Sequence, residues 1–221
     1  MKICYTNGVC GGKKMLIYFI RHGETDWNKN GRLQGRVDIP LNEEGKKAAL
    51  LTREGLKEVV FDVAFSSPLK RAYETAEIIL TGRNVPIIKD ERLREVGFGA
   101  YEGVKRSEWD ENIQNFFART ELYFPKGEGE HLEKVLEREA DFLRELFGND
   151  TYKDSTILVS THGAALSGLL TVIKGNSIAD FWAGGLHKNC GISIVEVKEG
   201  IPNILQEAIL LYDENRMKEG E

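Results

Sequence analysis

The sequence predicts an α/β protein, a three-layer α/β/α sandwich with a mostly parallel central sheet and a small helical lid insertion. Two observations predict this architecture. Short apolar runs rich in Ile, Val, Tyr and Phe alternate with longer segments whose apolar residues recur at helical spacing. His or Arg also follows three of the short runs within four residues. Strands that alternate with helices form parallel sheets covered on both faces, and ligands bind beyond the carboxyl ends of such strands.

The individual elements follow from these patterns. The first strand is expected at MLIYFI, residues 15–20, because this run is short and rich in Ile, Tyr and Phe. Further strands are expected at residues 61–67, 85–90, 155–160, 191–198 and 203–211. Helices are expected at residues 43–60, 68–80, 107–118, 131–147 and 163–173. Ser67 followed by Pro68 predicts the N-cap and the first position of the second helix, and Ser107 is expected to cap the third.

The length and composition favour one domain. The chain has 221 residues, of which 41% are hydrophobic, and this is enough to build a substantial core. The domain is expected over residues 15–212, with a lid at about residues 100–130. Residues 1–14 are polar and rich in Gly, and they are expected to form an extension outside the fold. Residues 213–221 are expected to form a frayed polar tail.

The charge pattern excludes several classes of function. A net charge of −5 gives no general attraction for nucleic acid or for an anionic membrane. No apolar run reaches the roughly 18 residues of a membrane span, and the N-terminus has no apolar region typical of a secretory signal. Three Cys do not make a disulfide framework, so a reduced, cytoplasmic protein is expected. Cys4 and Cys10 lack further ligands nearby, and neither a metal nor a cofactor is expected.

Cationic residues follow three of the predicted strands. Arg21 and His22 end the first strand, and His162 ends the strand at residues 155–160. Arg71 lies in the first turn of the helix after the strand at residues 61–67. Each of these residues alone is more often a surface residue. If the strand ends converge, however, two Arg and two His make a pocket for phosphate, because guanidinium groups and helix N-termini both bind phosphate oxygens.

The motifs around these residues resemble a known family. RHGETDWN, which begins at Arg21, resembles the signature of the histidine phosphatase superfamily, also called phosphoglycerate mutase-like. Five further blocks resemble that family in the family's own order, at residues 31–49, 66–79, 93–103, 129–138 and 160–170. The closest resemblance is to the branch of broad-specificity phosphatases and alpha-ribazole phosphatases. It implies an enzyme that acts on a small phosphorylated metabolite.

The resemblance also implies a role for each matching residue. It makes His22 the nucleophile that accepts the phosphoryl group, and Glu95 the general acid that later activates water. It makes Arg21, Arg71 and His162 the clamp on the phosphoryl oxygens, a role that suits the need of phosphoryl transfer for fixed positive charge. The positions that it implies in contact with the phosphate or the rest of the substrate are Asn28, Gln34, Gly35 and Gly163.

Other residues suited to a site have simpler interpretations. His131 and His187 are expected to be solvated, at a helix start and in a loop. Aromatic residues crowd the segment 104–125. They are expected either to pack a helix against the core or to form an apolar lid over the phosphate site.

The sequence favours hydrolysis over the alternatives. Mutases of the resembling family carry a longer lid insert with adjacent Arg residues, whereas the segment 104–128 is short and its Lys and Arg are scattered. We therefore expect a metal-independent phosphomonoesterase with a phosphohistidine intermediate. The alternatives are an alpha-ribazole 5′-phosphate phosphatase, a phosphoglycerate mutase and a non-catalytic phosphate-binding protein.

Overall fold

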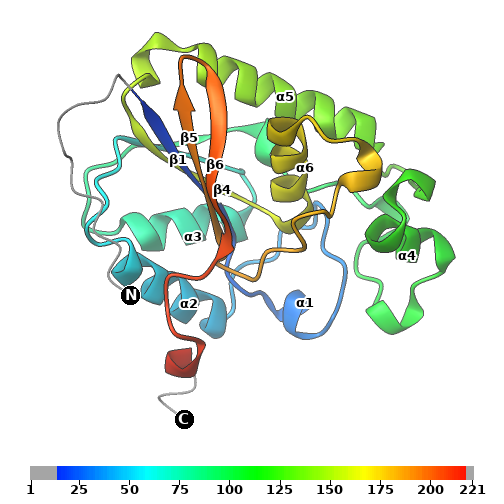
Figure 1. The fold of residues 1–221 in the computed structure, drawn as a ribbon. Coiled ribbons are helices and arrows are strands. Elements are labelled where there is room, and N and C mark those ends of the chain that lie inside the picture. Colours follow the sequence, from blue (N-terminus) through cyan, green and yellow to red (C-terminus); the bar gives the residue numbers. More distant parts are fainter. Residues whose placement is uncertain (1–13, 218–221) are drawn as a thin grey trace.

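The computed structural model describes residues 14–217 and contains a six-stranded sheet in the order β3-β2-β4-β1-β5-β6 (Figure 1). Residues 1–13 and 218–221 lie outside the described residues, and with them most of the predicted N-terminal extension and part of the predicted tail. The strands are β1 (Met15–Arg21), β2 (Val63–Ser66), β3 (Ile87–Lys89), β4 (Thr156–Thr161), β5 (Ile192–Lys198) and β6 (Ile201–Ile209). The predicted α/β sandwich is confirmed.

The sheet is mostly parallel, also as predicted. β1 pairs in parallel with β4, β4 with β2, and β2 with β3. β5 runs antiparallel to both β1 and β6. The β5–β6 turn consists of Glu199 and Gly200, which have positive φ angles of 52° and 78°. Two-residue turns with both central φ angles positive match the twist of paired strands, and this explains the tight hairpin at the edge of the sheet.

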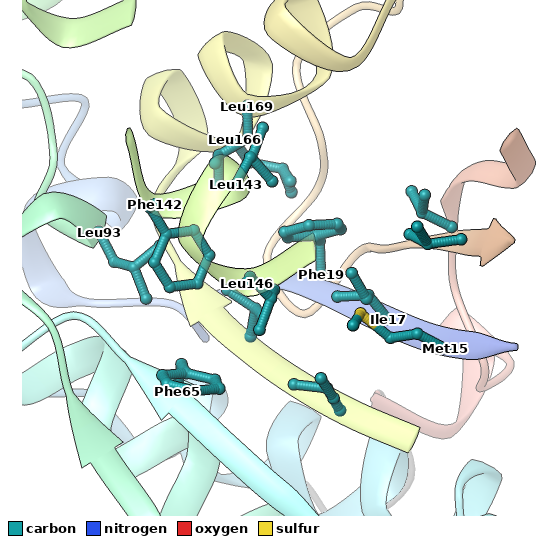
Figure 2. Packing of buried hydrophobic residues seen from close by; sticks show 14 of the residues in the cluster. Met15, Ile17, Phe19, Phe65, Leu93, Phe142, Leu143, Leu146, Leu166 and Leu169 are labelled. Atoms are coloured by element: carbon teal, nitrogen blue, oxygen red, sulfur yellow. The ribbon is translucent and has the colours of Figure 1, made fainter. Parts of the chain in front are cut away.

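Helices cover both faces of the sheet, and β1 shows how the faces are divided. Met15, Ile17 and Phe19 pack with apolar residues of α5 (Leu132–Gly148) and α6 (Gly163–Lys174), as Figure 2 shows. Tyr18 and Ile20 pack on the opposite face with residues of α2 (Glu43–Gly55) and α3 (Lys70–Leu80). Side chains alternate along a strand, so one fully apolar strand serves both layers.

The lid is a third apolar cluster beyond the end of the sheet. It is built around α4 (Glu111–Ala118), which lies at one end of the molecule (Figure 1). Phe116 is fully buried there and contacts Phe98 and Tyr123 edge-on. Phe116 belongs to this packed cluster and also lines a pocket, together with Trp109 and Phe117.

Several predicted boundaries were wrong. Helix α3 begins at Lys70 with Leu69 as its N-cap, and the predicted cap Ser67 instead contacts a ring nitrogen of His162. Helix α4 begins after Asp110, whose carboxylate accepts from the backbone N–H of Ile113, and not after Ser107. In both cases an N-cap further along the chain replaced the predicted one. Beyond β6, a short 3₁₀ turn at Glu214–Met217 contacts α2, where Lys47 Nζ donates to the carbonyl of Met217 at 2.6 Å.

The turn after β1 and the start of α2 approach each other closely through two glycines. A Cβ atom on Gly45 would lie 2.1 Å from the carbonyl oxygen of Glu24, and one on Gly23 would lie 2.6 Å from that of Gly45. Both clashes are with backbone, which cannot rotate away as a side chain does. These glycines therefore allow α2 to pack directly behind the end of β1.

Gly45→Ala should destabilise the fold by roughly 1–3 kcal/mol, because overpacking outweighs the gain in helix propensity of about 1 kcal/mol. Gly148→Ala is the matched control, since this helical glycine has nothing within 4 Å of an added Cβ and should be neutral or slightly stabilising. Urea unfolding of both variants measures the difference. Equal stability of the two variants would contradict the close approach.

Candidate active site

The largest concentration of predicted site residues lies around one cavity at the carboxyl ends of β1, β2 and β4. The cavity has a volume of about 400 Å³, within the range of about 300–1,000 Å³ typical of small-molecule sites. All but one of the predicted residues line it: Arg21, His22, Asn28, Gln34, Gly35, Arg71, Glu95 and Gly163. The exception, His162, is fully buried and contacts Arg71.

His22 presents one ring nitrogen as an acceptor. Its Nδ1 lies 2.7 Å from the carbonyl oxygen of Gly23, which can only accept, so Nδ1 carries the proton. Nε2 is then unprotonated, and its lone pair accepts from Arg71 Nε at 3.3 Å. Burial, and then the charges of Arg71 and Arg21, hold the pKa of His22 well below its usual 6.5. The ring is therefore a neutral imidazole, and this is the nucleophilic form.

Arg71 is a fully buried cation with neutral partners. Its Nη1 and Nη2 donate to the carbonyl oxygens of Val37 and Gly35 at 2.8 and 2.7 Å, and Nε is shared between the rings of His22 and His162. These bonds use three of the five N–H donors of a guanidinium group, which leaves two for a bound anion. Burial lowers the pKa of Arg71 to about 10, so the group stays charged at neutral pH.

His162 lies behind Arg71. Its Nδ1 accepts from Arg71 Nε at 3.1 Å, and its Nε2 lies 2.7 Å from Ser67 Oγ. Burial, followed by the charge of Arg71, lowers the pKa of His162 well below 6.5. His162 is thus neutral and orients the guanidinium of Arg71.

Arg21 is held by a loop whose importance the sequence did not reveal. Arg21 Nη1 donates to the carbonyl oxygen of His187 at 2.5 Å, while its Nε is buried without a partner among the described residues. Asn189 Nδ2 donates to the carbonyl of His22 at 3.0 Å. The backbone N–H of Cys190 donates to the carbonyl of Arg21, also at 3.0 Å. The loop therefore fixes the end of β1 from the outside.

The prediction of a solvated His187 was wrong. Its side chain is only 1% exposed, and its Nε2 lies 2.7 Å from Ser193 Oγ on β5. The loop folds back onto the sheet because Gly191 and Cys190 pair with the end of β1, and this brings His187 inside. By contrast, His131 is exposed at the start of α5, as predicted.

Glu95 lies at the N-terminus of α6. Its Oε1 accepts from the backbone N–H groups of Val96 and Ala165 at 3.0 and 2.9 Å, and Oε2 accepts one longer bond of 3.2 Å from Ala164. Carboxylates are stabilised at helix N-termini by the free N–H groups and the helix dipole. These bonds hold the carboxyl group at the cavity. Oε2 accepts one bond and Oε1 accepts two, so Oε2 can more readily form a further hydrogen bond.

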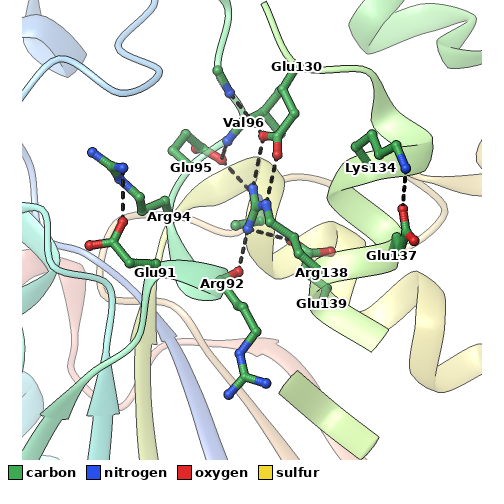
Figure 3. A network of polar contacts seen from close by, with 12 residues as sticks. Glu91, Arg92, Arg94, Glu95, Val96, Glu130, Lys134, Glu137, Arg138 and Glu139 are labelled. Atoms are coloured by element: carbon green, nitrogen blue, oxygen red, sulfur yellow. Dashed lines mark hydrogen bonds and ion pairs between the residues drawn. The ribbon is translucent and has the colours of Figure 1, made fainter. Parts of the chain in front are cut away.

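A partly buried polar network braces the loop that carries Glu95, as Figure 3 shows. Arg138 on α5 donates to the carbonyl of Arg92 on one side of the loop. It also forms a two-pronged ion pair with Glu130, with Nε–Oε1 and Nη2–Oε2 distances of 3.0 and 3.2 Å. The backbone N–H of Glu130 in turn donates to the carbonyl of Gly97 at 2.7 Å on the other side. Glu95 is thus held between two fixed points.

The neighbouring predicted residues shape the cavity by different means. Gly35 has a φ of 55°, and an added Cβ would lie 2.2 Å from Glu102 Oε1, so a side chain is excluded there. Gln34 Oε1 accepts from Thr25 Oγ1 at 2.9 Å. Asn28 accepts from the backbone N–H of Thr25 in the capping box of the short helix α1 (Asp26–Lys29). The sequence did not identify Arg32, Arg106 and Trp182 as lining residues, because lid geometry decides their position.

Two further features bear on the class of site. Within residues 14–217, no group of three or more His, Cys, Asp or Glu side chains is arranged to hold a metal ion. Cys4 and Cys10 lie outside the described residues. None of the helices in the same part of the chain has the length and apolar character needed to cross a membrane.

His187 should make folding stability depend on pH. Burial lowers its pKa to about 4 in the folded state, below the usual 6.5 of an unfolded chain. The contribution of His187 to the free energy of unfolding is therefore complete above about pH 6.5 and is lost as the pH falls toward 4. Between pH 7 and pH 5 the protein should lose about 2 kcal/mol of this free energy. His187→Gln should reduce the pH dependence of the urea unfolding free energy by about that amount. An unchanged pH dependence, at equal m-values, would contradict this assignment.

Comparison with known proteins agrees with this geometry. The chain matches the family described as "Histidine phosphatase superfamily (branch 1)" over residues 17–209. It is 33% identical to phosphoserine phosphatase 1 of Hydrogenobacter thermophilus over 83% of this chain and 87% of that protein. The structure of Bacillus stearothermophilus YhfR is similar with a TM-score of 0.81 and 32% identity, over 87% of this chain and 96% of that one. The structure of the alpha-ribazole phosphatase of Shigella flexneri is similar with a TM-score of 0.79 and 25% identity, over 90% of this chain and 98% of that one. The chain therefore belongs to the histidine phosphatase superfamily, as its motifs indicated.

Proposed function

We propose that this protein hydrolyses small phosphate monoesters through a phosphohistidine intermediate on His22. Membership of the superfamily supports phosphoric monoester hydrolase activity in general. The observation that supports the mechanism is the state of His22, a neutral ring whose Nε2 lone pair lies beside the buried cation Arg71. A nucleophile next to a fixed positive charge is what phosphoryl transfer requires.

In the first half-reaction, His22 Nε2 attacks phosphorus while the bond between phosphorus and the ester oxygen breaks. The Nδ1–H bond to the Gly23 carbonyl stabilises the positive charge that develops on the ring. Arg71 and Arg21 bind the phosphoryl oxygens, with the backbone of Gly163, the first residue of α6, beside them. Glu95, as the general acid, gives a proton to the leaving oxygen.

In the second half-reaction, water displaces the ring. The Glu95 carboxylate removes a proton from the water as its oxygen attacks phosphorus. The bond between phosphorus and Nε2 breaks, inorganic phosphate leaves, and His22 and Glu95 return to their initial states. The positive charge comes from Arg71 and Arg21, so neither half-reaction requires a metal ion.

A second candidate substrate is alpha-ribazole 5′-phosphate. The observation that favours it is the aromatic wall of the cavity, where the rings of Trp109 and Phe117 are parallel at 4.9 Å. Such a wall suits the flat base of a nucleoside-like ester. Phosphoglycerate mutase and non-catalytic phosphate binding are the less favoured alternatives. Release of inorganic phosphate from a panel of esters separates the two phosphatases from these alternatives and from each other, and an assay for interconversion of 3- and 2-phosphoglycerate separates the mutase from the binder.

His22→Ala should lower kcat/KM by roughly a thousandfold or more, because the attacking atom is removed. His131→Ala, which removes an exposed imidazole outside the cavity, is the matched control and should retain full activity. Wild-type enzyme quenched in alkali during turnover should carry acid-labile phosphate on His22. Substantial turnover by the alanine variant, or phosphate on another residue, would refute the nucleophile.

Glu95→Gln tests the acid. It should slow the phosphorylation step by roughly 10²–10⁴-fold on alkyl phosphates and much less on p-nitrophenyl phosphate, because a good leaving group departs without a proton. Burst kinetics separate this step from dephosphorylation, which should be slowed for both substrates. Glu91→Gln is the control, since this carboxylate pairs with Arg94 at the surface. Equal losses on the two leaving groups would mean that the acid is another residue.

A further inference from the structure

The cavity has an outer part that phosphoryl transfer does not use. Arg32 and Arg106 line it together with the catalytic residues, but neither contacts His22, Arg71 or Glu95 through a hydrogen bond or ion pair in the described residues. Both arginines are exposed at the cavity mouth. The volume of about 400 Å³ leaves room for a substrate much larger than its phosphate group.

Backbone pairing holds the two arginines next to each other. Arg32 forms an antiparallel bridge with Lys105, and the backbone N–H of Arg106 donates to the carbonyl of Gly31 at 2.8 Å. An added Cβ on Gly31 would lie 4.0 Å from the Cβ of Arg106. Two segments that are distant in the sequence therefore place two cationic side chains at one rim.

Neither guanidinium is neutralised by a carboxylate within residues 14–217. Arg32 Nη1 donates to the carbonyl of Gly103 at 2.8 Å, and the guanidinium carbon of Arg106 lies 5.7 Å from the ring centroid of Trp109. Elsewhere on this acidic chain, arginines such as Arg92 and Arg138 are paired with carboxylates. Two uncompensated cations at a cavity mouth attract an anion.

Aromatic rings line the wall beside these cations. Phe117 stacks on Trp109 at 4.9 Å and on Trp182 at 5.4 Å, with interplanar angles of 1° and 23°. Trp182 Nε1 donates to the carbonyl of Phe116 at 2.6 Å, which fixes the outer ring. The wall therefore offers rigid, apolar surface to whatever lies between the phosphate end of the cavity and the arginines.

We propose that Arg32 and Arg106 form a second anion subsite, and that the preferred substrate is a phosphomonoester with a flat or apolar spacer and an anionic group at its far end. The aromatic wall contacts the spacer, and the arginines bind the distal anion. This inference rests on the proposed function, because the phosphoryl group must occupy the end of the cavity at His22.

The test compares phenyl phosphate with 4-carboxyphenyl phosphate, which adds a distal carboxylate to the same ring. The preference is the ratio of their kcat/KM values, and differences in leaving group cancel when variants are compared with wild type. In Arg32→Gln/Arg106→Gln the preference for the carboxylated ester should fall by roughly tenfold, the effect of losing two partly exposed charge contacts. Arg119→Gln makes the same kind of charge change on the lid outside the cavity, and it should leave the preference unchanged.

Two further measurements complete the test. In the wild type, raising the salt concentration should weaken the preference, because exposed charges are screened, and this requires no variant to fold. O-phosphoserine, whose carboxylate lies close to its phosphate, should show no specific loss in the double variant. Equal losses for both aryl esters, or a preference that is insensitive to salt, would overturn the subsite.

The proposed hydrolytic function and the proposed anion subsite can be tested independently of each other. If the wild type hydrolyses neither ester, calorimetric binding of the two esters replaces turnover as the readout. A tighter affinity for the carboxylated ester that is lost in the double variant would then support the subsite while refuting hydrolysis. Equal affinities would refute the subsite itself.

Discussion

The hydrogen bonding of one buried guanidinium determines the arrangement of the site. Arg71 is fully buried, and within the described residues its partners are two backbone carbonyls and two imidazole nitrogens, with no carboxylate among them. A buried cation is tolerated only when its donors are satisfied. These acceptors come from the loop after α1, the end of β1 and the end of β4, so the packing that satisfies Arg71 also assembles the site.

The same cation controls its neighbours. It contributes to the low pKa values of His22 and His162, and it donates to the nitrogen of each ring that it faces. Each ring is therefore neutral and oriented before a ligand arrives. Because the direct partners of Arg71 are neutral, its guanidinium can pair with a phosphate dianion that enters the cavity. Preorganised charge of this kind needs little rearrangement during the reaction.

The reactive groups are fixed by partners outside the cavity. The loop at residues 187–191 holds the backbone of Arg21 and His22, and the ion pair of Arg138 with Glu130 brackets the loop that carries Glu95. Burial raises the pKa of the Cys190 thiol to about 12, so that residue contributes packing and backbone bonds, not a nucleophile. The outer cavity depends on a different element, the pairing of residues 31–33 with residues 103–106. In the proposed mechanism, catalysis and selection of the substrate thus depend on separate parts of the fold.

The sequence by itself determined the α/β class, the order of the strands along the chain and the residues at their carboxyl ends. It could do so because burial on both faces leaves an uninterrupted apolar run, and the residue after such a run lies at the edge where ligands bind. Arg21, His22, Arg71 and Glu95 were found in this way or through their motifs. Only the tertiary structure decided which nitrogen of His22 is free, that His187 is buried, and that Arg32 and Arg106 lie at one rim. Those properties depend on contacts between segments far apart in the chain, and no local pattern of residues records such contacts.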